Sequence, residues 1–462
     1  MHYLPNSPAG RERMLRSLGR ASAKELFTQI PENIQLDRPL ELPGPLSEVE
    51  ILEFFRQASD QSCKDYASFL GAGAYSHYRP TVVDSLSSRG EFFTTYTPYQ
   101  AEIAQGTLQA VFEFQSLICL LTGMDVANAS LYDGSTALTE AVLMALRIRR
   151  GRRKVLVARS VHPEYRQVLD TYLCHLDAET VEIPFTKSGQ VDLNVLEKEL
   201  SHEGANEVAA VAIQSPNFFG VLEDYQPVAE LTHKNKSLLI VTVTEPLSLA
   251  LVKPPSEADI VCGEGQSFGI PVAFGGPYVG LLAARQQFVR QLPGRLVGQT
   301  VDTEGRRGYV ITLATREQHI RREKATSNIC TNQSLCALVA TIYLSLLGRQ
   351  GLRQLAELNL AKAEYTKRQL TGTQDVDPAF SGKTFNEFVV RLPQEPDDLL
   401  KNLQQEKILG GVPLGRFYPE LKNSLLVCAT ETVGKTAIDR MAEVYQKTLA
   451  GSEALAPGKN TR

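Results

Sequence analysis

Hydrophobic and polar positions follow two alternating patterns beyond about residue 107. The stretch Thr107–Thr122 carries apolar residues at helical spacing, which predicts an amphipathic helix. After it, short apolar runs recur between helical stretches, and near-continuous runs of this kind are typical of buried parallel strands. The runs are 155–158, 181–184, 208–213, 238–243 and 260–262. Their alternation predicts an α/β fold with a mostly parallel central sheet covered by helices on both faces.

The C-terminal third has a different order of elements. A helical stretch from about residue 332 to residue 370 precedes two strand-like runs, 385–392 and 424–428. A final helix is expected over 433–449. This order predicts a smaller C-terminal α/β domain, followed by a polar tail that is expected to fray.

The first 60 residues predict short helices. Ser7 can cap a helix that begins with a proline, and Ser22–Glu25 and Ser47–Glu50 each fit a capping box. Apolar residues such as Ile51 and Phe54 then need a surface to pack against. These patterns divide the chain into an N-terminal helical segment 1–80, a large domain 81–331, a small domain 332–450 and a flexible tail 451–462.

Composition and charge narrow the class of protein. Of 462 residues, 43% are hydrophobic and 22% are charged, which is typical of a globular protein with a large core. The formal net charge of −4 is too small to indicate a nucleic-acid or membrane partner, and the basic run 147–154 fits the end of a helix. We expect neither a signal peptide nor an apolar run of membrane-spanning length. The seven cysteines show no metal-ligand spacing with the seven histidines, so we expect reduced thiols, a cytoplasmic location and no metal site.

A polar turn opens the helix that follows residue 133. Gly134, Ser135 and Thr136 come directly after Asp133, and a turn of this type can hold a phosphate on the amides of a helix N-terminus. Most turns of this composition are simple caps. Both interpretations stay open on the local sequence.

Two further segments are candidates for a cleft. Tyr96, Tyr99 and Gln100 lie close together before an amphipathic helix, where they either cover the edge of the sheet or line a binding cleft. His162 follows the strand at 155–158, and ligands gather at the carboxyl ends of strands in open α/β sheets. Its imidazole could stack on a flat cofactor or transfer a proton, although a histidine before a proline more often caps a helix.

Several segments, spread over most of the chain, together resemble the P-proteins of the glycine cleavage system. These segments are Phe69–Pro80, Tyr96–Gln100 with Gln105–Leu108, Tyr132–Thr136, Val161–Tyr165, Gly263–Phe268 with Phe274–Pro277, and Ile320–Asn332. In this family the protein is either one long chain or two subunits that correspond to its halves. The length of this chain fits the N-terminal half, which is the α subunit, or subunit 1, of the two-chain form.

The resemblance implies a fold-type-I transferase dependent on pyridoxal 5'-phosphate (PLP), similar to aspartate aminotransferase. It also implies glycine dehydrogenase (decarboxylating) chemistry, in which PLP acts as the electron sink while glycine loses CO2. The aminomethyl group then passes to the lipoyl arm of H-protein. The implied partners are a β subunit in an α2β2 assembly, lipoylated H-protein and glycine, with no nucleic acid and no membrane.

The same resemblance places Gln266 where the family keeps its Schiff-base lysine. A carboxamide nitrogen is not nucleophilic and cannot form an aldimine. PLP would therefore be bound covalently by the β subunit, with none covalent on this chain, and Gly134, Ser135 and Thr136 would be a vestigial phosphate turn. Glu245 stands in the region of the acid that pairs with the pyridinium nitrogen.

Tyr96, Tyr99, Gln100 and His162 are the candidates for lining an active site shared with the partner. Two alternatives remain open. The chain could be an autonomous PLP enzyme that uses a displaced lysine such as Lys324, or a purely structural subunit with no residue near the chemistry.

Overall fold

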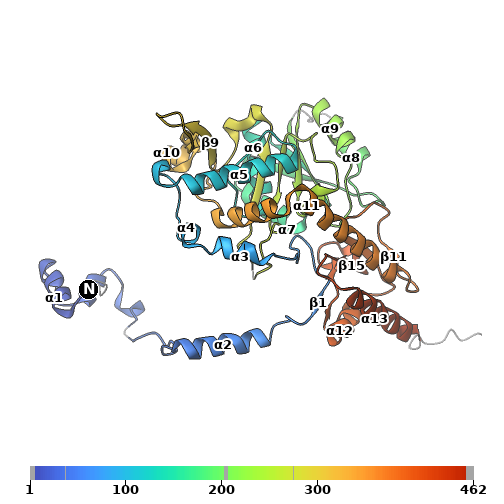
Figure 1. The fold of residues 1–462 in the computed structure, drawn as a ribbon, viewed down its shortest axis with the longest axis horizontal. Helices are drawn as coiled ribbons and strands as arrows, with labels where there is room; N and C mark the ends of the chain where they lie inside the picture. Colours follow the sequence, from blue (N-terminus) through green and yellow to red (C-terminus); the bar gives the residue numbers. More distant parts are fainter. Residues whose placement is uncertain (1–5, 37, 202–206, 274, 454–462) are drawn as a thin grey trace, which may run out of the picture. The chain divides into compact units, whose positions relative to one another are not determined.

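The computed structural model describes residues 6–36, 38–201, 207–273 and 275–453 (Figure 1). It divides into two compact units, Met1–Lys64 and Asp65–Arg462. Phe274 and the part of the predicted tail over 454–462 lie outside the described residues. The four-part division of the chain expected from the sequence remains a prediction.

The first unit consists of short helices whose described residues bury no side chain. The capping box at Ser47 forms as predicted, because the Ser47 hydroxyl accepts the Glu50 N–H and the Glu50 carboxylate accepts the Ser47 N–H at 2.7 Å. The box expected at Ser22 does not form, because the Ser22 hydroxyl caps no backbone N–H and the Glu25 carboxylate accepts the N–H of Ala21 instead. The helices are α1 (Pro8–Ser17), η1 (Ala23–Phe27), η2 (Glu32–Ile34) and α2 (Glu48–Asp60).

A seven-stranded sheet in the order β2-β8-β7-β6-β5-β3-β4 forms the centre of the second unit. Strands β3 to β7 run parallel to one another, and β8 is antiparallel to both of its neighbours. Every residue of β5 and β6 is buried, so both faces of the sheet are covered, as predicted. The strands are β2 (Val126–Ala127), β3 (Lys154–Ala158), β4 (Glu179–Ile183), β5 (Val208–Gln214), β6 (Leu238–Val243), β7 (Ile260–Glu264) and β8 (Gly280–Ala284).

Helices connect these strands and cover the sheet. The basic run 147–154 is the end of a helix followed by a strand, as predicted, because α6 ends at Ile148 and Gly151 adopts a φ of 85° before β3. The main helices are α3 (Thr81–Ser87), α4 (Gly90–Phe93), α5 (Gln105–Thr122), α6 (Gly134–Ile148), α7 (Pro163–Leu173), α8 (Leu193–Ser201) and α9 (Tyr225–Lys234). Short helices are η3 (Ala101–Ile103), η5 (Pro246–Ala250), η6 (Gln286–Gln291), η7 (Ala314–Arg316), α10 (Gln318–Arg321) and η8 (Arg322–Lys324).

Helix α11 (Ser334–Thr371) links two hydrophobic cores. Gly348, at φ 57° and ψ −173°, interrupts it. Side chains before this break, such as Tyr343, pack in the core around the central sheet, and Ala363 and Leu370 pack in a second core. By length and composition α11 could cross a membrane, and several of its apolar residues pack in the core around the central sheet.

The second core lies between a four-stranded antiparallel sheet and the C-terminal helices, which agrees with the predicted smaller α/β region. The sheet has the order β11-β12-β15-β14, with β11 (Asp377–Pro378), β12 (Glu387–Arg391), β15 (Ser424–Cys428) and β14 (Val412–Pro413). The helices are α12 (Asp397–Gln405), η9 (Leu414–Arg416), η10 (Pro419–Leu421) and α13 (Lys435–Glu453). Helix α13 continues to residue 453, four residues beyond the predicted end of the last helix at residue 449.

Two smaller strand pairings were not predicted from the sequence. An antiparallel hairpin joins β9 (Leu296–Val301) to β10 (Arg307–Thr312). A short parallel pair joins β1 (Ala67–Ser68) to β13 (Ile408–Leu409). This second pairing fixes the start of the segment 69–80, which passes from the C-terminal sheet towards the central sheet.

Candidate functional site

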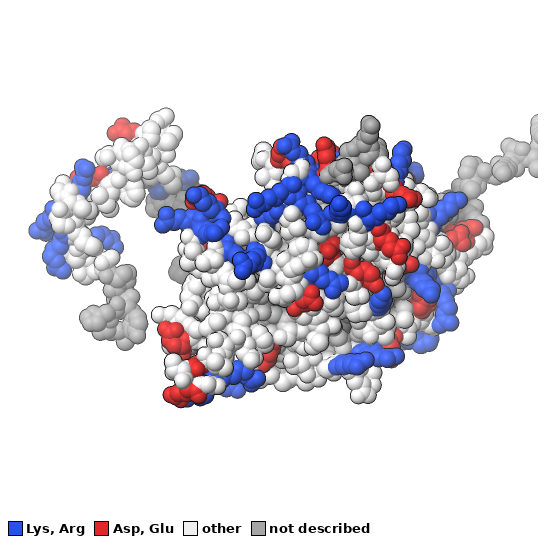
Figure 2. Space-filling model, turned by 90° about the horizontal axis from the view of Figure 1, so that it is seen from above, with Lys and Arg blue, Asp and Glu red and all other residues white. Residues whose placement is uncertain are grey.

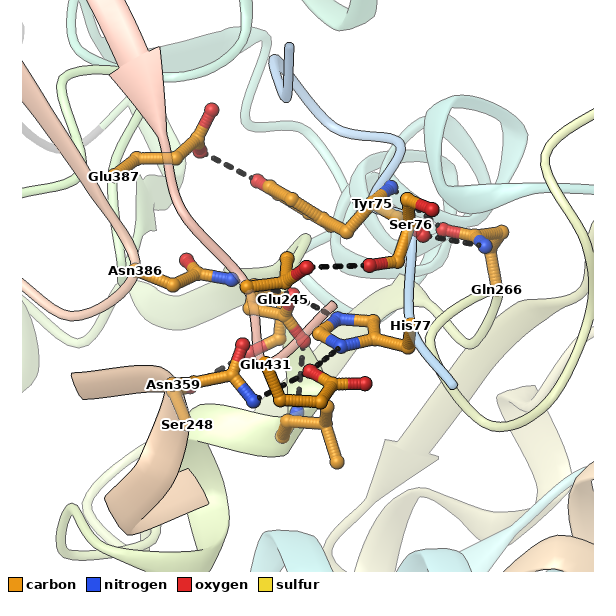
Figure 3. A network of polar contacts seen from close by, with 12 residues as sticks. Tyr75, Ser76, His77, Glu245, Ser248, Gln266, Asn359, Asn386, Glu387 and Glu431 are labelled. Carbon is orange, nitrogen blue, oxygen red and sulfur yellow. Dashed lines mark hydrogen bonds and ion pairs between the residues drawn. The ribbon is translucent and has the colours of Figure 1, made fainter. Parts of the chain in front are cut away.

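A buried polar network lies at the carboxyl edge of the central sheet, where ligands bind in open α/β folds (Figure 3). Glu245 follows β6 and Gln266 follows β7. The segment 69–80 crosses this edge and contributes Tyr75 and His77. The C-terminal sheet and α11 contribute the remaining members, which are Asn359, Asn386, Glu387 and Glu431.

Gln266 is 2% exposed, and both ends of its carboxamide are hydrogen-bonded. The side-chain oxygen accepts the N–H of Tyr75 at 2.8 Å, and the nitrogen donates to the carbonyls of Tyr75 at 3.0 Å and Ile270 at 2.7 Å. The carboxamide thus pairs with both main-chain groups of one residue, as a neighbouring strand would. Its role in this structure is to hold the segment 69–80 against the turn that follows β7.

His77 lies between two carboxylates. Its Nε2 is 2.9 Å from Glu245 and its Nδ1 is 2.9 Å from Glu431, and all three side chains are buried. Burial lowers the pKa of His77, but the two carboxylates, Glu245 above all, raise it further, to about 9. The ring is therefore an imidazolium at neutral pH, and each of its N–H groups donates to a carboxylate.

Both carboxylates have further partners. Glu245 accepts hydrogen bonds from the Asn386 amide at 2.9 Å and from the N–H of Leu247 at 3.1 Å. Glu431 accepts from the Asn359 amide at 2.8 Å. Buried charges are tolerated when they are paired and hydrogen-bonded in this way.

Glu387, on β12, holds the segment 69–80 from the other side. It accepts a hydrogen bond from the Tyr75 hydroxyl at 2.7 Å and from the N–H of Ala72 at 2.6 Å. Burial raises the pKa of Glu387 to about 7. A Cβ added to Gly71 would lie 2.2 Å from the Glu387 carboxylate, so the segment is packed too closely there for any larger residue.

The N-terminus of α6 is occupied by a carboxylate of the chain itself. Glu264, at the end of β7, accepts the N–H groups of Gly134 at 2.9 Å, Gln266 at 3.0 Å and Val279 at 3.0 Å. Burial raises the pKa of Glu264 to about 8, although the three N–H donors oppose the shift. A Cβ at Gly134 would lie 2.3 Å from the Tyr165 hydroxyl, so the space beside this turn is filled.

Ser135 and Thr136 bond to the helix cap. Asp133 caps α6 by accepting the N–H of Thr136 at 2.8 Å, and it also accepts the Ser135 hydroxyl at 2.7 Å. Thr136 completes a capping box with the N–H of Asp133 at 3.3 Å. In the structure this turn acts as a helix cap.

His162 also displays the role of a cap. Its Nδ1 accepts the N–H of Glu164 at 3.2 Å, so its Nε2 carries the proton and donates to the carbonyl of Ala72 at 2.8 Å. The ring stacks on Tyr165 with centroids 4.7 Å apart and planes at 25°. Burial lowers the pKa of His162, which keeps the ring neutral.

The other three cleft candidates lie outside this network. The Tyr96 side chain is 83% exposed and Gln100 is exposed. Tyr99 is half exposed, and its hydroxyl accepts a hydrogen bond from the buried Arg295 at 3.2 Å while the guanidinium lies 5.4 Å from its ring. Lys324, on η8, is exposed as well.

Comparisons with known proteins identify the family. The sequence profile of the glycine cleavage system P-protein matches residues 1–445. The chain belongs to this family. A probable glycine dehydrogenase (decarboxylating) subunit 1 of Solibacter usitatus is 54% identical over 443 residues, 96% of each chain. Its counterpart in Koribacter versatilis is 53% identical over 96% of this chain and 99% of the relative.

Solved structures confirm the predicted fold class. A crystal structure of glycine decarboxylase (P-protein) of the glycine cleavage system, in inhibitor-bound form, superposes with a TM-score of 0.86 at 43% identity, covering 97% of this chain and 100% of that chain. A glutamate decarboxylase of Lactobacillus brevis shares the fold alone, with a TM-score of 0.68 at 12% identity, covering 95% of this chain and 98% of that one. This member of the P-protein family therefore has the fold-type-I architecture.

At the positions that the resemblance assigns to the cofactor, the residues of this chain do not fit PLP. The cofactor needs a lysine for its Schiff base, an acid for its pyridinium nitrogen and donors for its phosphate. Gln266 offers no amine and is bonded to main chain. Glu245 is engaged by His77, and the first N–H of α6 by Glu264. Among the described residues, no group of three His, Cys, Asp or Glu side chains is placed to hold a metal ion either.

The surface carries both signs of charge. On the face shown in Figure 2, Lys and Arg side chains form a band with Asp and Glu beside them. Oppositely charged side chains of the chain also form pairs, for example Arg153 with Asp177 and Lys154 with Glu179. A surface of this mixed kind does not point to one class of charged partner.

Proposed function

We propose that the chain is the subunit of a two-chain P-protein that does not hold the cofactor. The observation that carries this proposal is Gln266, which the resemblance places at the Schiff-base position and which has both ends of its carboxamide bonded to main chain. Relatives that are named subunit 1 imply a partner, subunit 2. PLP would be bound covalently by that β subunit, where it supplies the electron sink for decarboxylation.

In this proposal the complex performs the glycine dehydrogenase (decarboxylating) reaction in the cytoplasm. It decarboxylates glycine and transfers the aminomethyl group to the lipoyl arm of H-protein. The assembly is proposed to be α2β2, and the isolated chain is proposed to be inactive.

Tyr96, Tyr99 and Gln100 are the proposed contribution of this chain to the shared active site. They are exposed polar groups on one loop, so a partner chain can reach them. Arg295 holds the Tyr99 hydroxyl from a buried position, where it also bonds to Asn332 at 3.0 Å. A phenol fixed in this way is suited to positioning a polar ligand, because its orientation is set before binding.

The exposed side chains of the first unit support the proposal of an obligate partner. Its side chains include many large apolar groups that are exposed, and burying such groups favours contact with another protein. Examples are Leu18, Ile34, Leu42, Val49, Phe54 and Phe55. We propose that the partner subunit covers them.

Co-expression with the β subunit tests the proposed function. Each chain alone and the pair are assayed for bound PLP and for glycine–bicarbonate exchange. We expect PLP and exchange in the pair, and borohydride reduction followed by mass spectrometry should locate the cofactor on the β subunit. An aldimine trapped on the isolated chain, for example on Lys324, would refute the proposal in favour of an autonomous enzyme.

Substitutions in the exposed loop separate a contributing subunit from a structural one. Tyr96→Phe and Tyr99→Phe are compared in the assembled complex with Tyr172→Phe, a half-exposed tyrosine on α7. Loss of exchange in the loop variants with intact assembly supports a shared site. Unchanged exchange in both would leave the purely structural subunit as the better account.

A further inference from the structure

We propose that the segment Phe69–Pro80, together with Glu264, is a built-in substitute for PLP in this chain. The segment occupies the cofactor position of the fold and bonds to the groups that a cofactor would engage. The inference goes beyond the proposed function, because it concerns this chain's own pocket and holds whether or not the partner binds PLP.

Three cofactor positions are engaged by one segment. Gln266, at the Schiff-base position, pairs with the main chain of Tyr75. Glu245, in the region of the pyridinium acid, bonds to His77, and His162, the candidate stacking residue, donates to the carbonyl of Ala72. Because Ala72, Tyr75 and His77 lie within six consecutive residues, a single stretch of chain closes the pocket.

The fourth position is closed by a carboxylate. In PLP enzymes of this fold a helix N-terminus holds the phosphate, because its free N–H groups and its dipole favour an anion. In this chain Glu264 reaches the first N–H of α6 at 2.9 Å from the neighbouring strand. The N–H of Thr136 is likewise taken by Asp133.

The substitute also reproduces hydrogen bonds that the cofactor would make. The pyridinium N–H of PLP donates to an acid, and here the His77 imidazolium donates to Glu245 at 2.9 Å. The phosphate of PLP brings negative charge to a helix N-terminus, and here Glu264 supplies a carboxyl group at that place. The pocket therefore keeps a donor and an acceptor where a cofactor would place them, without the cofactor.

The segment joins two sheets as well. Towards the central sheet it bonds to Gln266 and Glu245, and towards the C-terminal sheet it bonds to Glu387 and Glu431 (Figure 3). Motion of one sheet relative to the other would break buried hydrogen bonds on one side of the segment. The segment thus fixes the two sheets of the second unit to one another.

The first test restores the lysine in the full-length chain. Gln266→Lys is incubated with PLP, reduced with borohydride and mapped by mass spectrometry, with Gln167→Lys on the exposed face of α7 as the matched control for non-specific adducts. We expect no more adduct at position 266 than at position 167. Stoichiometric labelling at position 266, with visible aldimine absorbance, would overturn the proposal.

The second test uses the unaltered chain, so it does not depend on the folding of a variant. Hydrogen exchange is measured for the amides of Ala72 and Tyr75, which donate to buried acceptors. We expect exchange at least about a hundredfold slower than in the exposed turn around Gly305, and no change on addition of PLP. Fast exchange of both amides, or a response of this segment to PLP, would contradict the proposal and leave the proposed partner function intact.

Discussion

The segment 69–80 and the loop 96–100 both contribute to the resemblance to P-proteins, yet they differ in every physical respect. Tyr75 and His77 point inward, and the polar atoms of both side chains are bonded within the chain. Tyr96 and Gln100 point outward, and Tyr99 is held by one buried guanidinium. The difference teaches that a family motif can serve stability in one place and remain available to a partner in another, and that burial separates the two.

Of the substitutions that test this comparison, His77→Ala is expected to lower the free energy of unfolding most. The substitution removes the cation between Glu245 and Glu431 and leaves two buried carboxylates without it. Breaking a buried ion pair in this way costs about 3–5 kcal/mol of the free energy of unfolding. Urea unfolding of the full chain measures it, with the exposed His175→Ala as control. A change within about 0.5 kcal/mol would show that the network does not stabilise the fold.

The pH dependence of stability is the next largest effect. The folded-state pKa of His77 is about 9, above its ordinary value of 6.5. The stabilisation is therefore fully present below pH 6.5 and is lost as the pH rises through 9, with a total of about 3 kcal/mol. The pKa values of Glu264 and Glu387 are raised to about 8 and about 7. Their contributions to stability are therefore also lost as the pH rises, over a lower pH range than that of His77.

Unfolding midpoints measured from pH 6 to pH 9.5 check this prediction. The midpoint of the unaltered chain should fall across that range. In His77→Gln the part of the slope above pH 8 should disappear, because an amide does not titrate. An equal slope in both proteins would assign the pH dependence to other groups.

Gln266→Ala should have a smaller effect. It leaves the N–H and the carbonyl of Tyr75 and the carbonyl of Ile270 without their side-chain partner. Unsatisfied buried groups lower the free energy of unfolding by about 2 kcal/mol in total when water partly replaces the lost bonds. Gln167→Ala, on the surface of α7, is the control. Equal stability of the two variants would mean that the Gln266 carboxamide does not stabilise the position of the segment 69–80.

The smallest effect on stability is expected in the outward loop. Tyr99→Phe removes one partly exposed hydrogen bond to Arg295 and should cost less than about 1 kcal/mol. Glycine–bicarbonate exchange by the complex should nevertheless fall roughly tenfold, since the phenol is positioned for a ligand. Loss of stability without loss of exchange would reverse the contrast between the two regions.

The apolar pattern predicted most of the fold because burial on both faces of a sheet leaves a continuous signal. Strand β6 has the predicted bounds, and β15 does as well. The hairpin of β9 and β10 was missed because only three of its twelve strand residues are buried and its apolar residues form only short runs. The end of α13 was placed too early because polar residues 451–453 extend the helix.

The candidate site was only partly predictable. Gln266 was found because its position follows a buried strand and is fixed by the resemblance. Glu264 ends the same strand and carries the same positional signal, so it could have been found. His77, Glu387 and Glu431 could not, because Glu387 lies 312 residues from Tyr75 and Glu431 lies 354 residues from His77, and only tertiary contacts bring these pairs together.

The hydrogen bonds between Gln266 and the segment 69–80 affect how such a subunit can evolve. In the genetic code a glutamine codon becomes a lysine codon by one nucleotide change. In the protein the same change would bury an ammonium group and remove the acceptor of the Tyr75 N–H, while His77 and Glu264 would still close the pocket. A working lysine at this position would therefore need several coordinated substitutions, each unfavourable alone, and the proposed division of labour between two subunits would be difficult to undo.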